Sequence, residues 1–285
     1  MKTFHHISKM RDAVRAERAK GGRIGFVPTL GFLHEGHEAL IAAAMRDNDV
    51  VVVSRFVNPL QFRKKAFGRY PRDEARDAAI CDKNGVDYLF SPGVEEMYPE
   101  GFDTRAEVMD LTGRLEGGAI RWHYRGVVTV VVKLLNIVQP DTAYFGKKDA
   151  HQLAIIKRFV KDLNIPVEIR AVATRRAKDG LALSSRNSLL TPEERKAAVV
   201  IPDAIKAIGK KLKSGYADYR ALGMELEKLI EKEPKARVDF TAVVDAETLR
   251  EEVSGPSAMI YAAVFIGGKR LTDNLVVKLG PLNKK

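Results

Sequence analysis

The sequence is poor in cysteine and in long apolar runs. Its one cysteine, Cys81, excludes an intramolecular disulfide and gives no sign of an oxidising compartment. The longest apolar stretches, such as VVTVVVKLL, fall far short of the roughly 18 residues that a membrane-spanning helix needs. The N-terminus also lacks the apolar run of a signal peptide. We therefore expect a cytoplasmic protein that does not bind a membrane.

A clustered basic stripe is also missing, although the net charge is +11. The Lys and Arg residues are scattered and are not interleaved with stacking aromatic residues, which disfavours a nucleic-acid face. The charge alone is compatible with nucleic acid, with acidic small molecules or with a well-solvated surface. We expect small-molecule substrates and no nucleic-acid partner.

Short apolar runs alternate with helical patterns over the first 175 or so residues. This rhythm predicts parallel β/α units, and hence an α/β fold with a Rossmann-like, doubly wound parallel sheet. The predicted strands are residues 23–29, 49–57, 86–92, 142–146 and 166–172. The predicted helices are residues 37–48, 72–85, 126–139 and 149–164.

The pattern changes after residue 176. A polar connector precedes Thr191, Pro192 and Glu194, which form a complete capping box and predict that a helix begins at residue 192. A second helix around 216–232 and strand-like runs at 237–245 and 258–271 follow, which suit a small antiparallel sheet. We expect domains at 1–176 and 177–285, the second a smaller α+β lid, with a ligand cleft between them.

The first candidate motif is FVPTLGFLHEGH, a buried strand and a turn that lead into a helix. His34, Gly36 and His37 lie where free backbone N–H groups and the helix dipole favour an anion. A zinc site is a weaker alternative, because the spacing is wrong for a metalloprotease helix and no third ligand cluster is visible. A purely structural role is the other alternative. We expect phosphate contact, and no metal held by protein side chains.

Three further motifs carry polar side chains that suit substrate binding. In YFGKKDAHQL, Asp149 can cap a helix and Lys148 stands at a strand end, although a solvated lysine pair is the simpler alternative. The segment LALSSRN (181–187) suits a mobile phosphate clamp, or is only a polar loop. In FVNPLQF, Asn58 and Gln61 can bind substrate hydroxyls or carboxylates, although Asn58 also suits an ordinary Asn-Pro turn.

Together and in this order, these segments resemble the pantothenate synthetase (pantoate–beta-alanine ligase) family of the HxGH nucleotidyltransferase superfamily. GFVPTLGFLHEGH is similar to the family pattern GFVPTMGALHEGH, and FVNPLQF matches as it stands. GVDYLFSPGVEEMYP, LNIVQPDTAYFG and DGLALSSRN also match closely. The resemblance covers nearly the whole chain, so coincidence is implausible.

The resemblance implies an ATP-dependent ligase that works in two half reactions. The pantoate carboxylate attacks the α-phosphorus of Mg-ATP, and the amine of beta-alanine then displaces AMP from pantoyl adenylate. Such chemistry needs charge neutralisation and positioning more than a protein nucleophile. The family also implies ATP and Mg as cofactors, a lid that keeps water from the adenylate, and a homodimer.

The resemblance assigns roles to individual residues as well. The implied catalytic residues are His34, His37 as proton donor, Lys148 and Arg186. The implied ATP-binding residues are Leu30, Gly31, His34, Gly36, His37, Gly146, Lys148, Asp149, Arg175, Leu183, Ser184, Ser185 and Arg186. Gln61, Gln152 and Asn58 would bind pantoate or beta-alanine.

The departures from the family pattern gather near these motifs. Ile120 replaces a family arginine, and the neighbouring Arg121 is displaced by one residue, which changes its direction. Most of the other changes add positive charge beside the expected site, at Arg55, Arg63, Lys64, Lys65, Lys147 and Arg175. They leave two alternatives open: an adenylate-forming ligase with a changed acid or amine, and a catalytically weakened or engineered scaffold that binds an acidic partner.

Overall fold

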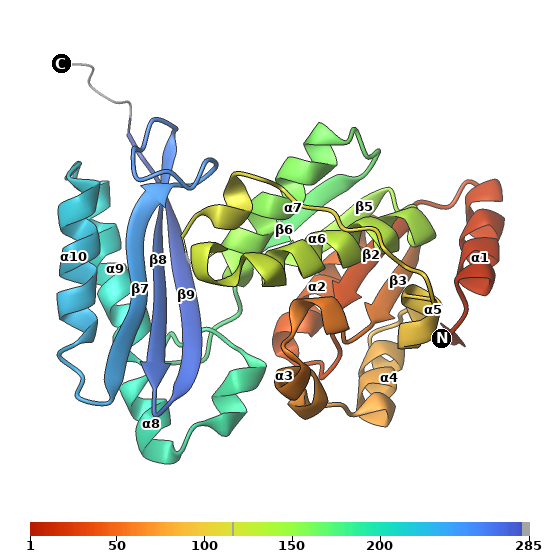
Figure 1. Cartoon of the computed structure of the whole chain (residues 1–285), viewed down its shortest axis with the longest axis horizontal. Coiled ribbons are helices and arrows are strands. Elements are labelled where there is room, and N and C mark those ends of the chain that lie inside the picture. Colours follow the sequence, from red (N-terminus) through yellow and green to blue (C-terminus); the bar gives the residue numbers. More distant parts are fainter. Residues whose placement is uncertain (116, 281–285) are drawn as a thin grey trace. The chain divides into compact units, whose positions relative to one another are not determined.

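The computed structural model describes residues 1–115 and 117–280 (Figure 1). The chain divides into two compact units. The N-terminal unit comprises residues 1–112, 119–147 and 155–173, and the C-terminal unit comprises residues 113–118, 148–154 and 174–285. The main changeover along the chain therefore falls between Ala173 and Thr174.

The N-terminal unit is built on a six-stranded parallel sheet. The strand order is β1-β4-β3-β2-β5-β6, and every neighbouring pair is parallel. The strands are β1 (Lys2–Phe4), β2 (Ile24–Thr29), β3 (Val50–Arg55), β4 (Tyr88–Phe90), β5 (Thr142–Gly146) and β6 (Glu168–Val172). The near-continuous burial of β2 and β3 is typical of parallel strands that are covered on both faces. The predicted fold class is confirmed.

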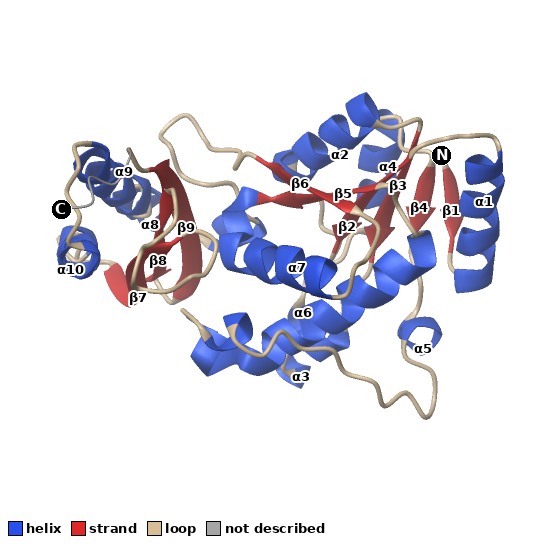
Figure 2. Ribbon diagram, turned by 90° about the horizontal axis from the view of Figure 1, so that it is seen from above, coloured by secondary structure: helices blue, strands red, loops and turns tan. Residues whose placement is uncertain are grey.

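Helices cover both faces of this sheet. Figure 2 shows α2 and α4 on one face and α6 and α7 on the other. The helices are α1 (Ile7–Ala19), α2 (Glu35–Asp47), α3 (Lys64–Arg69), α4 (Glu74–Lys83), α5 (Val94–Met97), α6 (Gly117–Val138) and α7 (Ala150–Asp162). The buried side chains of α2 pack with Val27, Val51 and Cys81 in one apolar core. No helix in the described ranges is long and apolar enough to cross a membrane.

The strand order reverses at β2. From β2 the chain moves outward through β3 to β4, and it later returns to β5 on the opposite side of β2. In open α/β sheets, ligands bind beyond the carboxyl ends of the strands at such a switch point. The turn that begins at Leu30 and the residues that end β5 at Gly146 both lie at this edge.

Helix α6 differs most from its prediction. It begins at Gly117, nine residues before the predicted start at Gly126, and it ends before Pro140 as predicted. The backbone of Ile120 is non-helical (φ −127°, ψ 31°), so the helix is kinked there. Residues 117–125, GGAIRWHYR, lack the regular apolar spacing of the rest of the helix, so apolar periodicity did not reveal them.

The C-terminal unit contains a three-stranded antiparallel sheet in the order β7-β8-β9. The strands are β7 (Ala236–Asp245), β8 (Ser257–Ile266) and β9 (Lys269–Lys278). The run 258–271, interpreted from sequence as one strand-like segment, belongs to two strands. Gly267 and Gly268 both have positive φ (53° and 80°), which matches the two-residue turn that joins tight hairpins.

This unit also contains the helices α8 (Pro192–Ala197), α9 (Val200–Lys213) and α10 (Tyr219–Ile230). The capping box of Thr191 and Glu194 is present, so the predicted helix start at residue 192 is confirmed. The break after α8 was not predicted. Pro202 cannot donate a backbone hydrogen bond, and a new helix that begins at Val200 places it in a first turn, where no donor is needed. The apolar faces of α9 and α10 pack with the sheet in one core.

Candidate active site

The turn after β2 carries both candidate histidines. His34 is the N-cap of α2, and its Nδ1 accepts a hydrogen bond from the backbone N–H of Gly36 at 3.1 Å. The Nδ1 of His37 accepts from the backbone N–H of His34 at 3.2 Å, which completes a reciprocal capping box. The imidazoles therefore satisfy two backbone donors at the start of the helix.

These two hydrogen bonds determine the tautomers of the histidines. Because a backbone N–H can only donate, each Nδ1 presents a lone pair, and each neutral imidazole carries its proton on Nε2. The ring centroids lie 4.2 Å apart. The pair thus provides two Nε2–H donors at one helix N-terminus, and the helix dipole also favours an anion there. This chemistry suits phosphate oxygens.

Gly36 has a reason for being glycine that lies within the motif. A Cβ at this position would lie 2.8 Å from Cε1 and 2.9 Å from Nδ1 of His34, because the ring folds back over the first turn. The glycine was predicted to let a ligand approach the backbone. The structure shows that it also makes room for the histidine that caps the helix.

The amide of Gln61 is held in one orientation by Asn58. The Nδ2 of Asn58 donates to the carbonyl oxygen of Gly126 at 3.0 Å, and its Oδ1 accepts from the N–H of Leu60 at 3.1 Å. Both contacts are to backbone, so they assign the oxygen and nitrogen of Asn58 without ambiguity. The second Nδ2 hydrogen of Asn58 must then meet an acceptor, which is Oε1 of Gln61 at 3.0 Å.

Gln61 consequently offers its Nε2 as a donor. No hydrogen bond from this Nε2 to any residue in the described ranges is present, and the residue is 6% exposed. An amide donor matches the hydroxyl and carboxylate oxygens of a substrate. Asn58 is fully buried, and Tyr98 donates to its Oδ1 at 2.8 Å, so its amide groups are all engaged within the protein. Burial raises the pKa of the Tyr98 phenol, which keeps it a donor.

Helix α6 packs against the same turn, the 3-10 helix Pro59–Gln61. The Nδ1 of His123 lies 2.7 Å from the carbonyl oxygen of Gln61, and since a carbonyl only accepts, this Nδ1 carries a proton. Gly126 approaches so closely that a Cβ there would overlap the carbonyl group of Leu60. The sequence did not single out His123 or Gly126 as functional, because their importance depends on a turn more than 60 residues away.

In the C-terminal unit, β9 holds the segment that contains Lys148. The Nδ2 of Asn274 donates to the carbonyl oxygen of Lys148 at 2.6 Å. The Nζ of Lys148 lies 3.3 Å from Oδ1 of Asp149 and 3.5 Å from Oγ1 of Thr272. Lys148 is therefore anchored at its backbone, and it is not a fully solvated lysine as the simpler alternative supposed. Asp149 is exposed and pairs with Lys148.

The connector before α8 is also tied to β9. Arg176 forms a bidentate ion pair with the buried Asp273, with Nη1 2.6 Å from Oδ2 and Nη2 2.9 Å from Oδ1. The N–H of Leu183 donates to the carbonyl oxygen of Arg175 at 2.9 Å, so the segment doubles back on itself. Ser184 caps the 3-10 helix Ser185–Leu189, and the Nη1 of Arg186 donates to the carbonyl oxygen of Arg270 at 2.9 Å.

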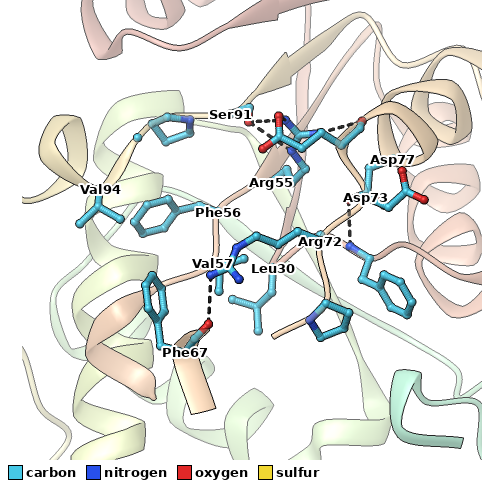
Figure 3. A pocket seen from close by; sticks show the side chains of 16 residues that line it. Leu30, Arg55, Phe56, Val57, Phe67, Arg72, Asp73, Asp77, Ser91 and Val94 are labelled. Carbon is cyan, nitrogen blue, oxygen red and sulfur yellow. Dashed lines mark hydrogen bonds and ion pairs between the residues drawn. The ribbon is translucent and has the colours of Figure 1, made fainter. Parts of the chain in front are cut away.

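A cavity of about 150 Å³ lies within the N-terminal unit, where β2, β3 and β4 end (Figure 3). The candidate residues Leu30 and Gly31 line it together with Arg55. Arg55 is directed toward Ser91, whose Oγ lies 2.8 Å from its Nη2, and it pairs with Glu74 at 2.9 Å. Its charge is therefore neutralised locally.

The other basic departures are placed in different ways. Arg121 donates to the carbonyl oxygen of Met109 at 3.1 Å and lies 3.5 Å from Glu107. Arg63 lies over the ring of Trp122 at 5.8 Å. Exposed residues make up the rest: Lys64, Lys65, Lys147 and Arg175. Gly146 and Gln152 are half-buried, at the end of β5 and in the first turn of α7.

Comparison with known proteins shows the family to which this chain belongs. The model of the family "Pantoate-beta-alanine ligase" matches residues 2–276. This chain belongs to the pantoate-beta-alanine ligase family. A pantothenate synthetase of Moorella thermoacetica is 46% identical over 282 residues, which are 98% of this chain and 99% of that protein. The prediction of an ATP-dependent ligase of this family is confirmed.

Solved structures of the family agree in fold. The pantothenate synthetase of Thermus thermophilus superposes with a TM-score of 0.89 at 44% identity, covering 96% of this chain and 99% of that one. The pantoate-beta-alanine ligase of Francisella tularensis, solved with beta-gamma ATP and beta-alanine, has a TM-score of 0.79 at 33% identity. It covers 99% of both chains.

Proposed function

We propose that this protein condenses pantoate with beta-alanine at the expense of ATP, through pantoyl adenylate, and releases AMP and pyrophosphate. The observation that supports this most directly is the tautomer of the histidine pair. Both imidazoles carry their proton on Nε2, and they lie at one helix N-terminus at the switch point of the sheet. The family membership and the ATP and beta-alanine complex of the Francisella tularensis relative support the same reaction.

In the first half reaction, an oxygen of the pantoate carboxylate bonds to the α-phosphorus of ATP. The bond from that phosphorus to its bridging oxygen breaks, and pyrophosphate leaves with the electron pair. We assign His34 and His37 to the phosphate oxygens, with His37 as proton donor from Nε2. Lys148 and Arg186 add positive charge. Such preorganised donors act on charge that develops in the transition state.

In the second half reaction, the amine of beta-alanine attacks the acyl carbonyl carbon of the adenylate. The amide bond forms, AMP leaves, and the amine loses a proton. Gln61 would hold a pantoate or beta-alanine oxygen through its Nε2, with Gln152 as a second amide contact. Direct substrate contact by Asn58 stays a prediction, and its contacts support a role in orienting Gln61.

The remaining ATP contacts are part of this proposal too. Leu30, Gly31, Gly36, Gly146, Asp149 and Arg175 would line the nucleotide, and Leu183, Ser184 and Ser185 would close on it with the domain 177–285 as a lid. Within residues 1–115 and 117–280, no group of three or more His, Cys, Asp or Glu side chains is placed to hold a metal ion. Magnesium would arrive with the nucleotide phosphates.

The proposal is tested by mixing the protein with Mg-ATP, pantoate and beta-alanine and measuring AMP and pantothenate. Pantoate-dependent exchange of labelled pyrophosphate into ATP, without beta-alanine, isolates the first half reaction. We expect both activities. A folded sample that forms neither AMP nor pantothenate would refute the proposal.

A changed acid substrate is the second candidate, and one observation favours it. The exposed basic residues Arg63, Lys64 and Lys65 follow closely after Gln61. A panel of carboxylic acids, scored by pyrophosphate release, separates the two candidates. An acid with a higher kcat/KM than pantoate would support this second candidate.

Two expectations about the whole molecule also stay proposals. A homodimer would show twice the mass of 31.7 kDa by light scattering, and a monomer would contradict it. We also propose a cytoplasmic location, which fractionation of the source cells would test.

A further inference from the structure

The turn between β2 and the histidine pair has an unusual backbone. Gly31 has a φ of 82°, and Phe32, which carries a side chain, has a φ of 53°. A left-handed conformation is costly for a residue with a Cβ, so it persists only where neighbouring groups hold it. Successive backbone N–H groups that converge in a turn make a concave site for a negative charge.

The negative charge is supplied by Asp77 of α4. Its Oδ2 accepts from the N–H of Phe32 at 2.8 Å, and its Oδ1 accepts from the N–H of Leu33 at 2.7 Å. Asp77 is 1% exposed, so these bonds are shielded from water. The guanidinium of Arg76, the neighbour of Asp77, lies over the Phe32 ring at 5.3 Å. Helix α4 therefore contacts both the backbone of this turn and the side chain of Phe32.

The nearby hydroxyl of Thr29 is already engaged in other hydrogen bonds. The N–H of Gly31 already donates to Oγ1 of Thr29 at 3.1 Å, and Thr29 donates in turn to the carbonyl oxygen of Ser54. The space around Gly31 is filled as well, because a Cβ there would lie 2.9 Å from both Oδ2 of Asp77 and Cγ of Arg55. Figure 3 shows Asp77 and Arg55 on the same side of the cavity.

The turn leads directly into the reactive pair. Leu33, whose N–H is bound by Asp77, precedes His34, the N-cap of α2. The direction of the chain at Leu33 therefore sets where α2 begins and where the two Nε2–H groups point. We propose that Asp77 is a positioning residue of the adenylation step, which acts through the left-handed turn on His34 and His37. This inference rests on the proposed function, since it takes the histidine pair to bind the nucleotide phosphates.

A purely structural role for Asp77 is the rival explanation. In that case, substituting Asp77 would lower the thermal stability, and activity would fall only in proportion to the unfolded fraction. If Asp77 is a positioning residue, its substitution instead alters the folded enzyme and lowers the rate of adenylation at saturating substrate. This loss of rate should also depend on the side chain at position 32, because glycine adopts positive φ without help from a carboxylate.

The test compares Asp77→Asn, Phe32→Gly and the double variant with the wild type. Asp77→Asn keeps the shape but offers one acceptor and one amide donor to two N–H groups. We expect its pantoate-dependent pyrophosphate exchange to fall at least tenfold in kcat, with the KM for beta-alanine in the full reaction unchanged. Adding Phe32→Gly should restore at least threefold of that loss. Asp82→Asn, on the same helix but exposed and paired with the N-terminal amine, is the matched control and should match the wild type.

Exchange within twofold of the wild type in folded Asp77→Asn would overturn the inference, as would a double variant no faster than Asp77→Asn. If Asp77→Asn does not fold, Asp77→Glu is tested in its place. Glutamate keeps the charge, but its side chain is one methylene longer and displaces the turn. Glutamate is then expected to lower exchange at an unchanged melting temperature, and wild-type exchange would refute the idea. Absence of exchange in the wild type would refute the proposed function itself, which separates the two failures.

Discussion

Gly126 of α6 packs its backbone directly onto the carbonyl group of Leu60. No side chain fits between them, and the carbonyl oxygen of Gly126 also accepts from Asn58, which orients Gln61. The position of one proposed substrate contact thus depends on a helix that is far away in the sequence.

Substituting Gly126 by alanine should therefore displace the Gln61 turn. Overpacking a tight contact costs roughly 1–3 kcal/mol of stability. We expect a lower melting temperature and a KM for pantoate that rises about tenfold, because the Gln61 amide moves. Gly68→Ala is the control, since a Cβ at Gly68 meets no atom within 4 Å and alanine favours a helix. Unchanged pantoate kinetics in Gly126→Ala would contradict the role of this packing.

Asn58→Asp tests the orientation of the Gln61 amide. Aspartate keeps the acceptor for Leu60 but loses both donors, to the carbonyl oxygen of Gly126 and to Oε1 of Gln61. Leaving buried groups unpaired costs about 1–3 kcal/mol. We expect weaker binding of pantoate with little change in the KM for ATP, measured by initial rates. Asn136→Asp, an exposed asparagine on α6, is the control. Equal rises in both KM values would argue against a local effect.

His37 has two separable tasks, helix capping through Nδ1 and proton donation through Nε2. Asparagine can keep an acceptor near the Nδ1 position but lacks the second donor, whereas glutamine can place its amide nitrogen near Nε2. We expect His37→Asn to lose about 100-fold or more in pyrophosphate exchange. His37→Gln should retain more activity. Circular dichroism melting would show whether the cap is kept, and a faster His37→Asn than His37→Gln would refute the assignment.

Asn274→Asp should weaken the hold of β9 on Lys148. The donor to the Lys148 carbonyl oxygen is lost, and a negative charge appears beside it. We expect the KM for ATP to rise about tenfold, since a charged phosphate contact loses its fixed position. Thr272→Ser keeps the hydroxyl near Nζ and should behave as the wild type. A KM for ATP that stays constant would show that this backbone contact does not serve nucleotide binding.

Cys81 should be inert in the folded enzyme. Burial, with a smaller effect of the neighbouring Asp77, raises the pKa of its thiol to about 11. At pH 8 about one thiol in a thousand would then be ionised, and the thiolate is the reactive form. Iodoacetamide should leave the native protein unlabelled by mass and fully active, while the protein in denaturant takes up one label. Native labelling with loss of activity would contradict this prediction.

Local patterns in the sequence predicted much of the fold. The bounds of β5 agree with the prediction, and the helix at Pro192 begins where the capping box predicted. Such features depend on residues only a few positions apart. The predictions were poorer where apolar periodicity is absent, as in the first turns of α6, and where one apolar run contains two strands, as at β8 and β9.

In the candidate site, too, local features could be predicted from the sequence and contacts between distant residues could not. By itself the sequence determined the histidine pair and its place between a strand and a helix, because strand, turn and cap are neighbours in the chain. Only the tertiary structure decided how the turn before the histidines, the Gln61 amide and the Lys148 segment are held. The contacts of Asp77 with Phe32, Asn58 with Gly126 and Asn274 with Lys148 span 45, 68 and 126 residues. Packing brings such partners together, and no local propensity records them.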